Sequence, residues 1–465
     1  MTAEEAAAAP EGIQTMPMTG MPDYTFTMAI SQLDCTGCGS CANVCPGKKG
    51  VKALAMESLA AHEAEQKYFD YATKLPAKAD VVEKFKENTV KGSQFKQPLL
   101  EFSGACAGCG ETPYAKLVTQ LFGDRMYIAN ATGCSSIWGN SSPSTPYTVN
   151  AKGQGPAWSN SLFEDNAEFG YGMLLAQRAI RDGLKAKVED VVANGTNEDV
   201  KAAGQEWLDT FAVGATNGAA TDKLVAALEA CGCDKAKEIL AQKDFLAKKS
   251  QWIFGGDGWA YDIGFGGVDH VLASGEDINI MVFDTEVYSN TGGQSSKSTP
   301  TGAIAQFAAG GKETKKKDMA SIAMSYGYVY VAQISMGADF NQTVKAIAEA
   351  EAYPGPSLII AYAPCINHGI KKGMAKAQTE EELAVKCGYW HNFRFNPAAD
   401  KKFALDSKTP DMENYMDFLN GEVRYNSLQR QNPEKAARLF AKNESEAKAR
   451  YDYLNKLVAM YGEEE

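Results

Sequence analysis

Four cysteines that lie far apart in the chain could together bind one metal centre. Cys106 and Cys109 share the glycine-rich stretch 104–111, while Cys134 and Cys365 each follow an apolar segment. Four thiolates suit either a 4Fe–4S cluster or a tetrahedral zinc ion. Spacing alone does not separate these two metals, so the sequence predicts one Cys₄ site and leaves its metal open.

A second pattern has the residue types of a metal–diphosphate site. Asp257 lies between Gly256 and Gly258, just after an apolar segment. Mg²⁺ prefers oxygen ligands, and Asp257 can supply one, while the flanking glycines let the backbone approach phosphates closely. One crossover helix and a returning strand would bring Thr285 beside Asp257. We therefore expect the Thr285 hydroxyl and the Val287 carbonyl to be the remaining protein ligands of Mg²⁺.

The run Cys35-x2-Cys38-x2-Cys41-x3-Cys45-Pro46 is typical of bacterial ferredoxins. In two-cluster ferredoxins the fourth cysteine of such a run ligates the other cluster. Cys35, Cys38 and Cys41 would then bind one 4Fe–4S cluster, and Cys45 would bind its neighbour. Either a partner segment supplies the second run, or all four cysteines bind one cluster. A zinc knuckle is less favoured, because of the trailing Cys-Pro pair and the glycines.

The chain has eleven cysteines and no secretory signal at its N-terminus. This combination favours metal ligation in a reducing compartment over disulfides, and we expect a cytoplasmic protein. Cys231 and Cys233 are interpreted as surface or packed thiols rather than ligands, and Cys387 as a buried apolar thiol.

A parallel sheet would position these motifs. Apolar segments alternate with helical patterns, which predicts a doubly wound α/β sheet with helices on both faces. The candidate strands are 126–130, 251–254, 279–283, 328–332 and 357–362, and the helical patterns are 114–122, 261–272, 317–324 and 343–352. Every motif of the main domain except the 104–111 loop lies just past the carboxyl end of a strand, the edge where open α/β sheets bind cofactors.

Composition divides the chain into five segments. We predict a disordered lead at 1–24, a partial 4Fe–4S ferredoxin-type domain at 25–56, a connector at 57–95, a cofactor-binding domain at 96–390 with a helical insertion at about 185–248, and a helical C-terminal extension at 391–465. The three lysines Lys315–Lys317 are interpreted as a solvated loop.

Charge and hydropathy exclude two classes of partner. The formal net charge of −12 disfavours nucleic acid, since a phosphate backbone needs a basic surface. No apolar run approaches the roughly 20 residues of a membrane span. We therefore expect a globular protein without nucleic-acid or membrane partners.

Several motifs in the sequence resemble those of known protein families. Gly256-Asp257-Gly258 with Asp284-Thr285 is similar to the thiamine diphosphate motif, with Asp-Thr standing where an Asn pair is usual. The sequences at 101–114, 130–137, 158–170 and 284–294 closely resemble pyruvate:ferredoxin (flavodoxin) oxidoreductase, and the resemblance covers roughly residues 25–430. An iron–sulfur cluster beside thiamine diphosphate is typical of oxidative decarboxylation of a 2-oxo acid, and this position favours the cluster over zinc.

The resemblance implies a role for each matching residue. The four cysteines of the Cys₄ site would ligate the cluster proximal to thiamine, and Glu111 and Cys134 would also contact the cofactor. Asn290 would face the substrate, so Asn290 and Glu111 are the candidate catalytic residues. The implied diphosphate and Mg²⁺ site consists of Gly256, Asp257, Gly258, Trp259, Thr285, Glu286, Val287, Tyr288, Ser289 and Asn290.

The resemblance also implies partners. Members of this family convert pyruvate and coenzyme A to acetyl-CoA and CO₂, and pass electrons to ferredoxin or flavodoxin. The family polypeptide is far longer, so we expect this chain to be a C-terminal part that needs an N-terminal portion and forms a dimer of complete units. Three alternatives stay open: an electron-transfer and scaffold subunit, an oxidoreductase for another 2-oxo acid, and a non-oxidative thiamine enzyme.

Overall fold

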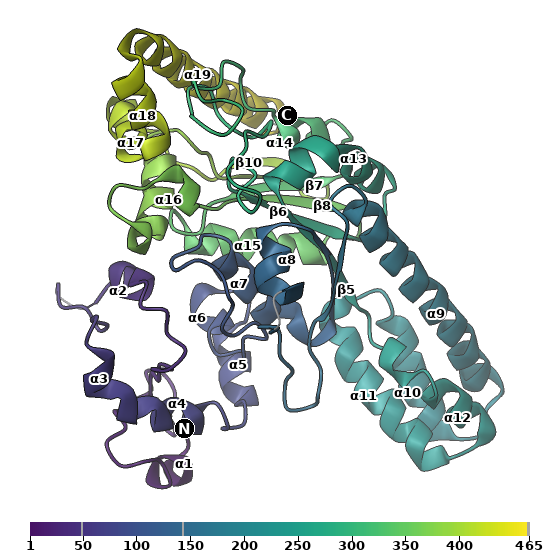
Figure 1. The fold of residues 1–465 in the computed structure, drawn as a ribbon. Coiled ribbons are helices and arrows are strands. Elements are labelled where there is room, and N and C mark those ends of the chain that lie inside the picture. Colours follow the sequence, from purple (N-terminus) through teal and green to yellow (C-terminus); the bar gives the residue numbers. More distant parts are fainter. Residues whose placement is uncertain (48–49, 142–143, 463–465) are drawn as a thin grey trace.

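The computed structural model describes residues 1–47, 50–141 and 144–462 and is built around one large sheet (Figure 1). The strand order is β10-β9-β7-β8-β6-β5-β3-β4. Strands β3 to β8 run parallel to one another, and β9 and β10 add an antiparallel hairpin at one edge. The strands are β3 (Met126–Ala131), β4 (Ala157–Ser161), β5 (Ser250–Gly256), β6 (Asn279–Asp284), β7 (Tyr330–Ile334), β8 (Ser357–Tyr362), β9 (Phe393–Phe395) and β10 (Phe403–Leu405).

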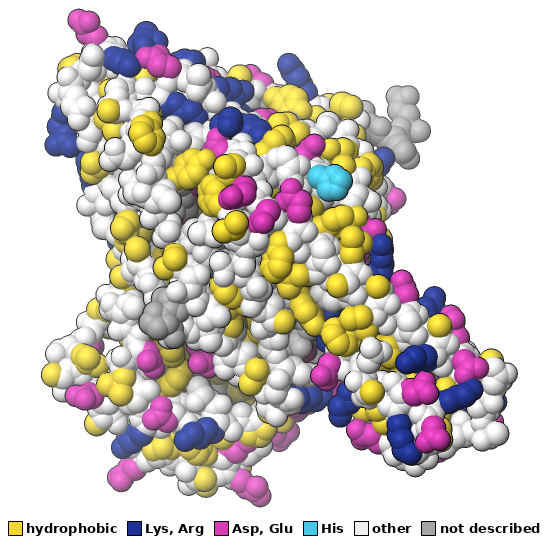
Figure 2. Space-filling view, turned by 45° about the vertical axis from the view of Figure 1, so that its right-hand side comes forward, with side chains coloured by type: hydrophobic (Ala, Val, Ile, Leu, Met, Phe, Trp, Pro, Cys, Tyr) yellow, Lys and Arg dark blue, Asp and Glu magenta, His cyan; other side chains and the backbone are white. Residues whose placement is uncertain are grey.

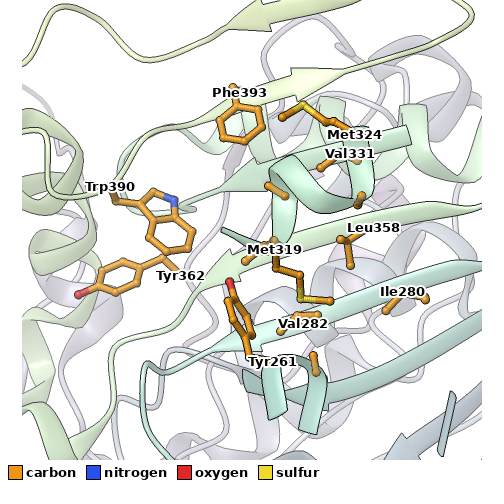
Figure 3. Packing of buried hydrophobic residues seen from close by; sticks show 14 of the residues in the cluster. Tyr261, Ile280, Val282, Met319, Met324, Val331, Leu358, Tyr362, Trp390 and Phe393 are labelled. Carbon is orange, nitrogen blue, oxygen red and sulfur yellow. The ribbon is translucent and has the colours of Figure 1, made fainter. Parts of the chain in front are cut away.

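Both faces of the sheet are covered, because the strand residues are apolar on both sides. Ile280 and Val282 of β6 face one core, which also contains α13 (Phe265–Ala273) and α14 (Met319–Met324), as Figure 3 shows in part. Met281 and Phe283 face the other core. That second core contains α7 (Thr112–Phe122) and α15 (Phe340–Ala352). The predicted doubly wound α/β fold is confirmed.

The structure adds three strands to the five expected from apolar segments. Strand β4 is an edge strand of sequence Ala-Trp-Ser-Asn-Ser that is half-buried to exposed, so it has no apolar run. Strands β9 and β10 lie within the segment expected to be a helical extension. Because each has only three residues, neither gives a periodic pattern.

The helical insertion forms a core of its own. It consists of the long α9 (Asn166–Asn194), α10 (Glu198–Asp209), α11 (Gly214–Cys231) and α12 (Asp234–Leu240). Trp207 and Leu228 are fully buried in this unit. Figures 1 and 2 show that it projects from the main body and carries many charged side chains of both signs.

Residues 1–24 differ from the expected disordered lead. Thr2 caps the short helix α1 (Ala3–Ala7) through a capping box, and β1 (Met16–Pro17) pairs with β2 (Thr25–Phe26). Glu5 of α1 forms an ion pair of 2.5 Å with Lys78 of the connector. These local hydrogen bonds and the contact with the connector give the lead a defined conformation.

Five short α-helices follow among the described residues between 40 and 93. They are α2 (Ser40–Val44), α3 (Leu59–His62), α4 (Gln66–Ala72), α5 (Ala79–Phe85) and α6 (Val90–Ser93). The predicted domain boundaries at residues 24, 56, 95 and 390 stay predictions.

The C-terminal part wraps the sheet with helices after the β9–β10 hairpin. They are α17 (Tyr415–Gly421), α18 (Val423–Gln431) and α19 (Pro433–Gly462), and α16 (Ala377–Lys386) precedes the hairpin. Leu439 and Leu454 of α19 join the same core as α13. Residues 463–465 of the predicted extension lie outside the described residues. Within the described ranges, no helix has the length and apolarity that a membrane crossing requires.

Candidate functional site

The sheet brings four of the predicted loops to one edge. Strands β3, β5, β6 and β8 are consecutive neighbours in the sheet and run in the same direction. Cys134 follows β3 at the start of the short helix α8 (Cys134–Ser136), and Asp257 follows β5. Thr285 follows β6, and Cys365 lies three residues beyond β8. The carboxyl ends of these strands therefore assemble the candidate site.

Three oxygen atoms gather at the predicted magnesium site. The Thr285 hydroxyl lies 2.9 Å from a carboxylate oxygen of Asp257 and 2.9 Å from the carbonyl oxygen of Val287. The second carboxylate oxygen of Asp257 accepts a hydrogen bond of 2.6 Å from Ser296. This all-oxygen set fits the preference of Mg²⁺.

The electrostatics of this site also favour a cation. Asp257 is fully buried, and burial together with the nearby Asp284 carboxylate raises its pKa to about 8. A buried acidic group of this kind is ionised at neutral pH when a cation lies beside it. The residues present therefore fit a divalent metal.

Behind the metal site, charged residues hold the loop after β6 in place. Glu286 has a left-handed backbone with φ of 59°, and its carboxylate lies 2.8 Å from both Lys316 and Arg424. Burial alone would raise the pKa of Glu286, but the two cations outweigh burial and lower the pKa to about 2. Lys316 also contacts Asp284 at 2.9 Å. The interpretation of Lys315–Lys317 as a solvated loop is wrong for Lys316, because two buried carboxylates pair with it.

The four cysteines of the Cys₄ site lie close enough for their thiols to affect one another's pKa values. Burial raises the pKa of Cys365 to about 11, with smaller contributions from Glu111 and Cys106. Burial likewise raises the pKa of Cys109, and the Cys134 and Cys365 thiols raise it further. Within the described ranges, no three His, Cys, Asp or Glu side chains are grouped closely enough to hold a metal ion.

The cysteines could hold either of two metal centres. Four thiols suit a zinc ion or a 4Fe–4S cluster, and either would supply the positive charge that buried thiols need to ionise. Hydrogen bonds to the sulfurs come from the Asn367 backbone to Cys365 at 3.5 Å and between Cys134 and Ser289 at 3.1 Å.

A cavity of about 550 Å³ joins the cysteine site to the metal–diphosphate site. Its size is within the range of cofactor sites. It is lined by Glu111, Thr132, Gly133, Cys134, Phe163, Gly256, Gly258, Trp259, Val287, Tyr288, Ser289, Asn290, Thr291, Gln294, Ser295 and Phe307. Asp257, Thr285 and Glu286 are buried and absent from this lining.

Two residues of the lining show how closely the cavity is built. A Cβ on Gly258 would lie 2.6 Å from the ring of Tyr288, so any larger residue would clash. Glu111 is 3% exposed and accepts a hydrogen bond of 2.8 Å from Trp138. Burial raises the pKa of Glu111 to about 7, despite that hydrogen bond.

The ferredoxin-type run lies in the segment before residue 96, here called the N-terminal unit, away from the sheet edge. Cys35 and Cys41 are exposed, and Cys38 and Cys45 are half-buried. The Cys45 sulfur accepts a hydrogen bond of 3.2 Å from the backbone N–H of Ala53, the main reason that its pKa falls below the usual value. The structure does not bring these four cysteines together with the Cys₄ site.

One short segment nevertheless contacts both cysteine loops. The Asn43 side chain of α2 donates a hydrogen bond of 2.9 Å to the carbonyl of Ala375, and Lys376 donates to the Asn43 side chain. A Cβ on Gly108, in the Cys106–Cys109 loop, would lie 2.5 Å from the carbonyl oxygen of Met374. Residues 374–376 therefore lie between the two loops.

Sequence reasoning missed several residues of the site. Phe163 and Phe307 line the cavity, and Arg424 braces Glu286 from a distance of more than a hundred positions. Phe163 lies within the stretch 158–170 that carries the resemblance, so that signal was present. A lone arginine and a lone phenylalanine give no signal in one sequence.

Comparisons with known proteins agree with this geometry. The family model for the C-terminal TPP-binding domain of thiamine pyrophosphate enzymes matches residues 212–361. The model for the 4Fe-4S binding domain matches residues 28–48, which include the ferredoxin-type run. The predicted thiamine and 4Fe–4S cofactor classes are thus confirmed.

Curated relatives match nearly the whole chain. A pyruvate-flavodoxin oxidoreductase of Klebsiella pneumoniae is 54% identical over 98% of this chain and 39% of its own length. A pyruvate:ferredoxin oxidoreductase of Moorella thermoacetica is 56% identical over the same shares. The NADP⁺-dependent pyruvate dehydrogenase of Euglena gracilis is 46% identical over 98% of this chain and 25% of its own length.

These relatives confirm the resemblance seen in the sequence, and they are oxidoreductases by name. The chain spans 39% of the length of the first two of these relatives. A solved 2-oxoglutarate:ferredoxin oxidoreductase from Magnetococcus marinus is 14% identical, with a TM-score of 0.34 over 57% of this chain and 65% of that chain, which is too low to inform the fold.

Proposed function

We propose that this chain is the cofactor-bearing part of an enzyme that oxidises pyruvate with coenzyme A to acetyl-CoA and CO₂. The electrons pass through 4Fe–4S clusters to ferredoxin or flavodoxin. The single observation that carries the proposal is the shared cavity of about 550 Å³, lined by Cys134 of the Cys₄ site and by Gly256 and Val287 of the diphosphate site.

The side chains of this cavity support a division of roles. Thiamine diphosphate would supply an electron sink for decarboxylation, and the clusters would accept electrons one at a time. Asp257, Thr285 and Val287 would hold Mg²⁺ on the diphosphate. Glu111, with a pKa of about 7, can hold or release a proton within the cavity near neutral pH. Asn290 lies in the lining, where it would orient the substrate.

The proposed enzyme needs more than this chain. The relatives are more than twice as long, so we infer that a further N-terminal portion completes the site. From the family resemblance we also propose a cytoplasmic dimer of complete units. Phe307 supports a covering partner, because it lines the cavity yet is 92% exposed.

Viologen reduction tests the proposal. The anaerobically purified chain is mixed with pyruvate, coenzyme A and an oxidised viologen dye, alone or with a segment that spans the rest of a relative's length. We expect turnover only when both parts are present. Turnover by the chain alone would refute the need for a second portion.

The complete mixture also separates the rival functions. A loaded but inactive mixture with pyruvate would refute pyruvate as the substrate, and activity with another 2-oxo acid would then identify a different oxidoreductase. Decarboxylation without dye reduction would identify a non-oxidative thiamine enzyme.

A further inference from the structure

Two cysteines outside the cofactor site face each other on the helical insertion. Cys231 ends α11, Gly232 forms the turn, and Cys233 precedes α12. The two sulfur atoms are 3.0 Å apart, and Cys231 donates a hydrogen bond to the sulfur of Cys233. As the sequence indicated, Cys233 is a surface thiol and Cys231 a packed one, and their mutual contact is a feature that the sequence did not predict.

The two thiols differ in exposure and in acidity. Cys233 is exposed, whereas Cys231 is half-buried and packs against the core that contains Leu228. The hydrogen bond from Cys231, with a second from the backbone N–H of Ala236, lowers the pKa of Cys233. The same contact with Cys233 raises the pKa of Cys231. Because the thiolate is the nucleophile, Cys233 is the sulfur that would react first.

The turn between the cysteines is open to a reactant. Gly232 has φ of 61°, a conformation that glycine adopts without strain, and a Cβ at this position would meet no heavy atom within 4 Å. To form a disulfide, the sulfurs must approach by about 1 Å, to the usual bond length of about 2.05 Å.

We propose that Cys231 and Cys233 form a reversible dithiol–disulfide site that exchanges with low-molecular-weight disulfides. The Cys233 thiolate attacks a disulfide RSSR, forms a mixed disulfide and releases one RS⁻. The Cys231 thiol then loses its proton and attacks the Cys233 sulfur, which closes the intramolecular disulfide and releases the second thiol. Two thiols of the protein are oxidised and one RSSR is reduced to two thiols.

The site is separate from the cofactor-binding cysteines. It packs against the core of the insertion, while Cys109, Cys134 and Cys365 lie at the sheet edge. Thiol–disulfide exchange at this pair therefore requires no cofactor. It does not rest on the proposed function, so either proposal can be refuted without the other.

Peptide mapping of the whole chain tests the proposal. The anaerobically purified chain is equilibrated with glutathione and glutathione disulfide at graded ratios, quenched with acid, alkylated with iodoacetamide and digested with trypsin. Cleavage after Lys223 and Lys235 yields residues 224–235, which contain only these two cysteines. We expect this peptide to lose two hydrogens and resist alkylation in oxidising buffer, and a dithiol reductant to reverse the change.

Two variants give the order of attack. Cys231→Ser should accumulate a mixed disulfide with glutathione on Cys233, because the resolving thiol is missing. Cys233→Ser should slow the reaction at Cys231 by on the order of tenfold, since the more acidic thiol is missing. The buried Cys387, in its own tryptic peptide, is the internal control and should stay reduced.

Three outcomes would overturn the proposal. They are a 224–235 peptide that stays fully alkylated in oxidising buffer, two glutathiones added independently to one chain, and a disulfide that joins two chains instead of Cys231 to Cys233.

Discussion

Asp257 is the residue on which the metal–diphosphate site depends most. Its carboxylate is buried, and it contacts both Thr285 and Ser296. We expect Asp257→Asn to weaken binding of thiamine diphosphate in the presence of Mg²⁺ by on the order of 100-fold, because the amide removes the negative charge that the cation needs. Calorimetric titration of both proteins measures the difference.

A matched control keeps this test specific. Asp269→Asn changes a carboxylate of α13 that accepts a hydrogen bond from Tyr326 and does not line the cavity. This substitution should leave the affinity for thiamine diphosphate in the presence of Mg²⁺ unchanged. Equal weakening by both substitutions would show that Asp257 does not act as a metal ligand.

The buried His391 lies outside the cofactor site and should make the stability of the folded protein depend on pH. The side chain is 3% exposed, both ring nitrogens lack a hydrogen-bond partner, and burial lowers its pKa to about 3. The folded pKa is below the unfolded value of about 6.5, so the stability from neutral His391 is complete above pH 6.5 and is lost as pH falls toward 3.

Replacing His391 with a ring that does not titrate should remove this dependence. Between pH 7.5 and 5, the free energy of unfolding of His391→Phe should rise relative to the wild type by about 2 kcal/mol. Urea unfolding of both proteins at the two pH values gives this number. An equal change in the free energy of unfolding of the two proteins between pH 7.5 and 5 would contradict the prediction.

At the residue scale, the sequence predicted those site residues whose chemical type and local spacing form a motif. The glycines around Asp257 and the strand before Thr285 predicted a metal site, and the structure places the Thr285 hydroxyl 2.9 Å from the Asp257 carboxylate. Lys316 and Arg424 could not be predicted, because they resemble surface charges in the sequence and meet Glu286 only through the fold. Long-range ion pairs leave no local pattern.

Among the elements, the helical insertion should behave as a separate stability unit. Trp207 is fully buried in its core and donates a hydrogen bond of 3.2 Å to the Leu246 carbonyl. Trp207→Ala should destabilise this unit by about 3–5 kcal/mol, since truncation leaves a large cavity. Hydrogen exchange should then accelerate in α10 to α12 and stay unchanged in β5 and β6.

Val213→Ala is the matched control within the same unit, because Val213 is 49% exposed. This substitution should change the rates of amide hydrogen exchange little. Faster exchange throughout the sheet of Trp207→Ala would show that the insertion and the sheet unfold together.

The contact between α2 and residues 374–376 is the second prediction at this scale. Asn43→Ala removes its hydrogen bonds with Ala375 and Lys376, each worth about 1 kcal/mol. We expect amide exchange in α2 and in residues 374–376 to rise by up to about 30-fold, the factor that corresponds to about 2 kcal/mol. Asn194→Ala, which removes a bond to Asp190 within α9, should leave exchange in α2 and in residues 374–376 unchanged.

Elements with strong apolar runs were predictable, and polar or short ones were not. The five apolar strands and the helical insertion were expected from the sequence. Strand β4 was missed because it is polar, and β9 and β10 because tertiary pairing alone stabilises three residues. The capping box at Thr2 was a readable signal for order in the lead.

For the whole molecule, the sheet edge explains why distant motifs form one site. Parallel strands place the loops after β3, β5, β6 and β8 side by side, so a chain with widely spaced motifs can build one cavity. The sequence could predict this convergence, because the topology of parallel sheets is restrictive. It could not predict how the N-terminal unit contacts residues 374–376, since that contact involves few residues.

Native mass spectrometry of the anaerobically purified chain, incubated with thiamine diphosphate and Mg²⁺, tests the central claim most directly. We predict that the chain carries one thiamine diphosphate, one Mg²⁺ and a 4Fe–4S cluster at the Cys₄ site, and that Cys365→Ser loses this cluster but keeps thiamine diphosphate. A zinc ion in place of the cluster, or a chain that binds no thiamine diphosphate, would contradict the account.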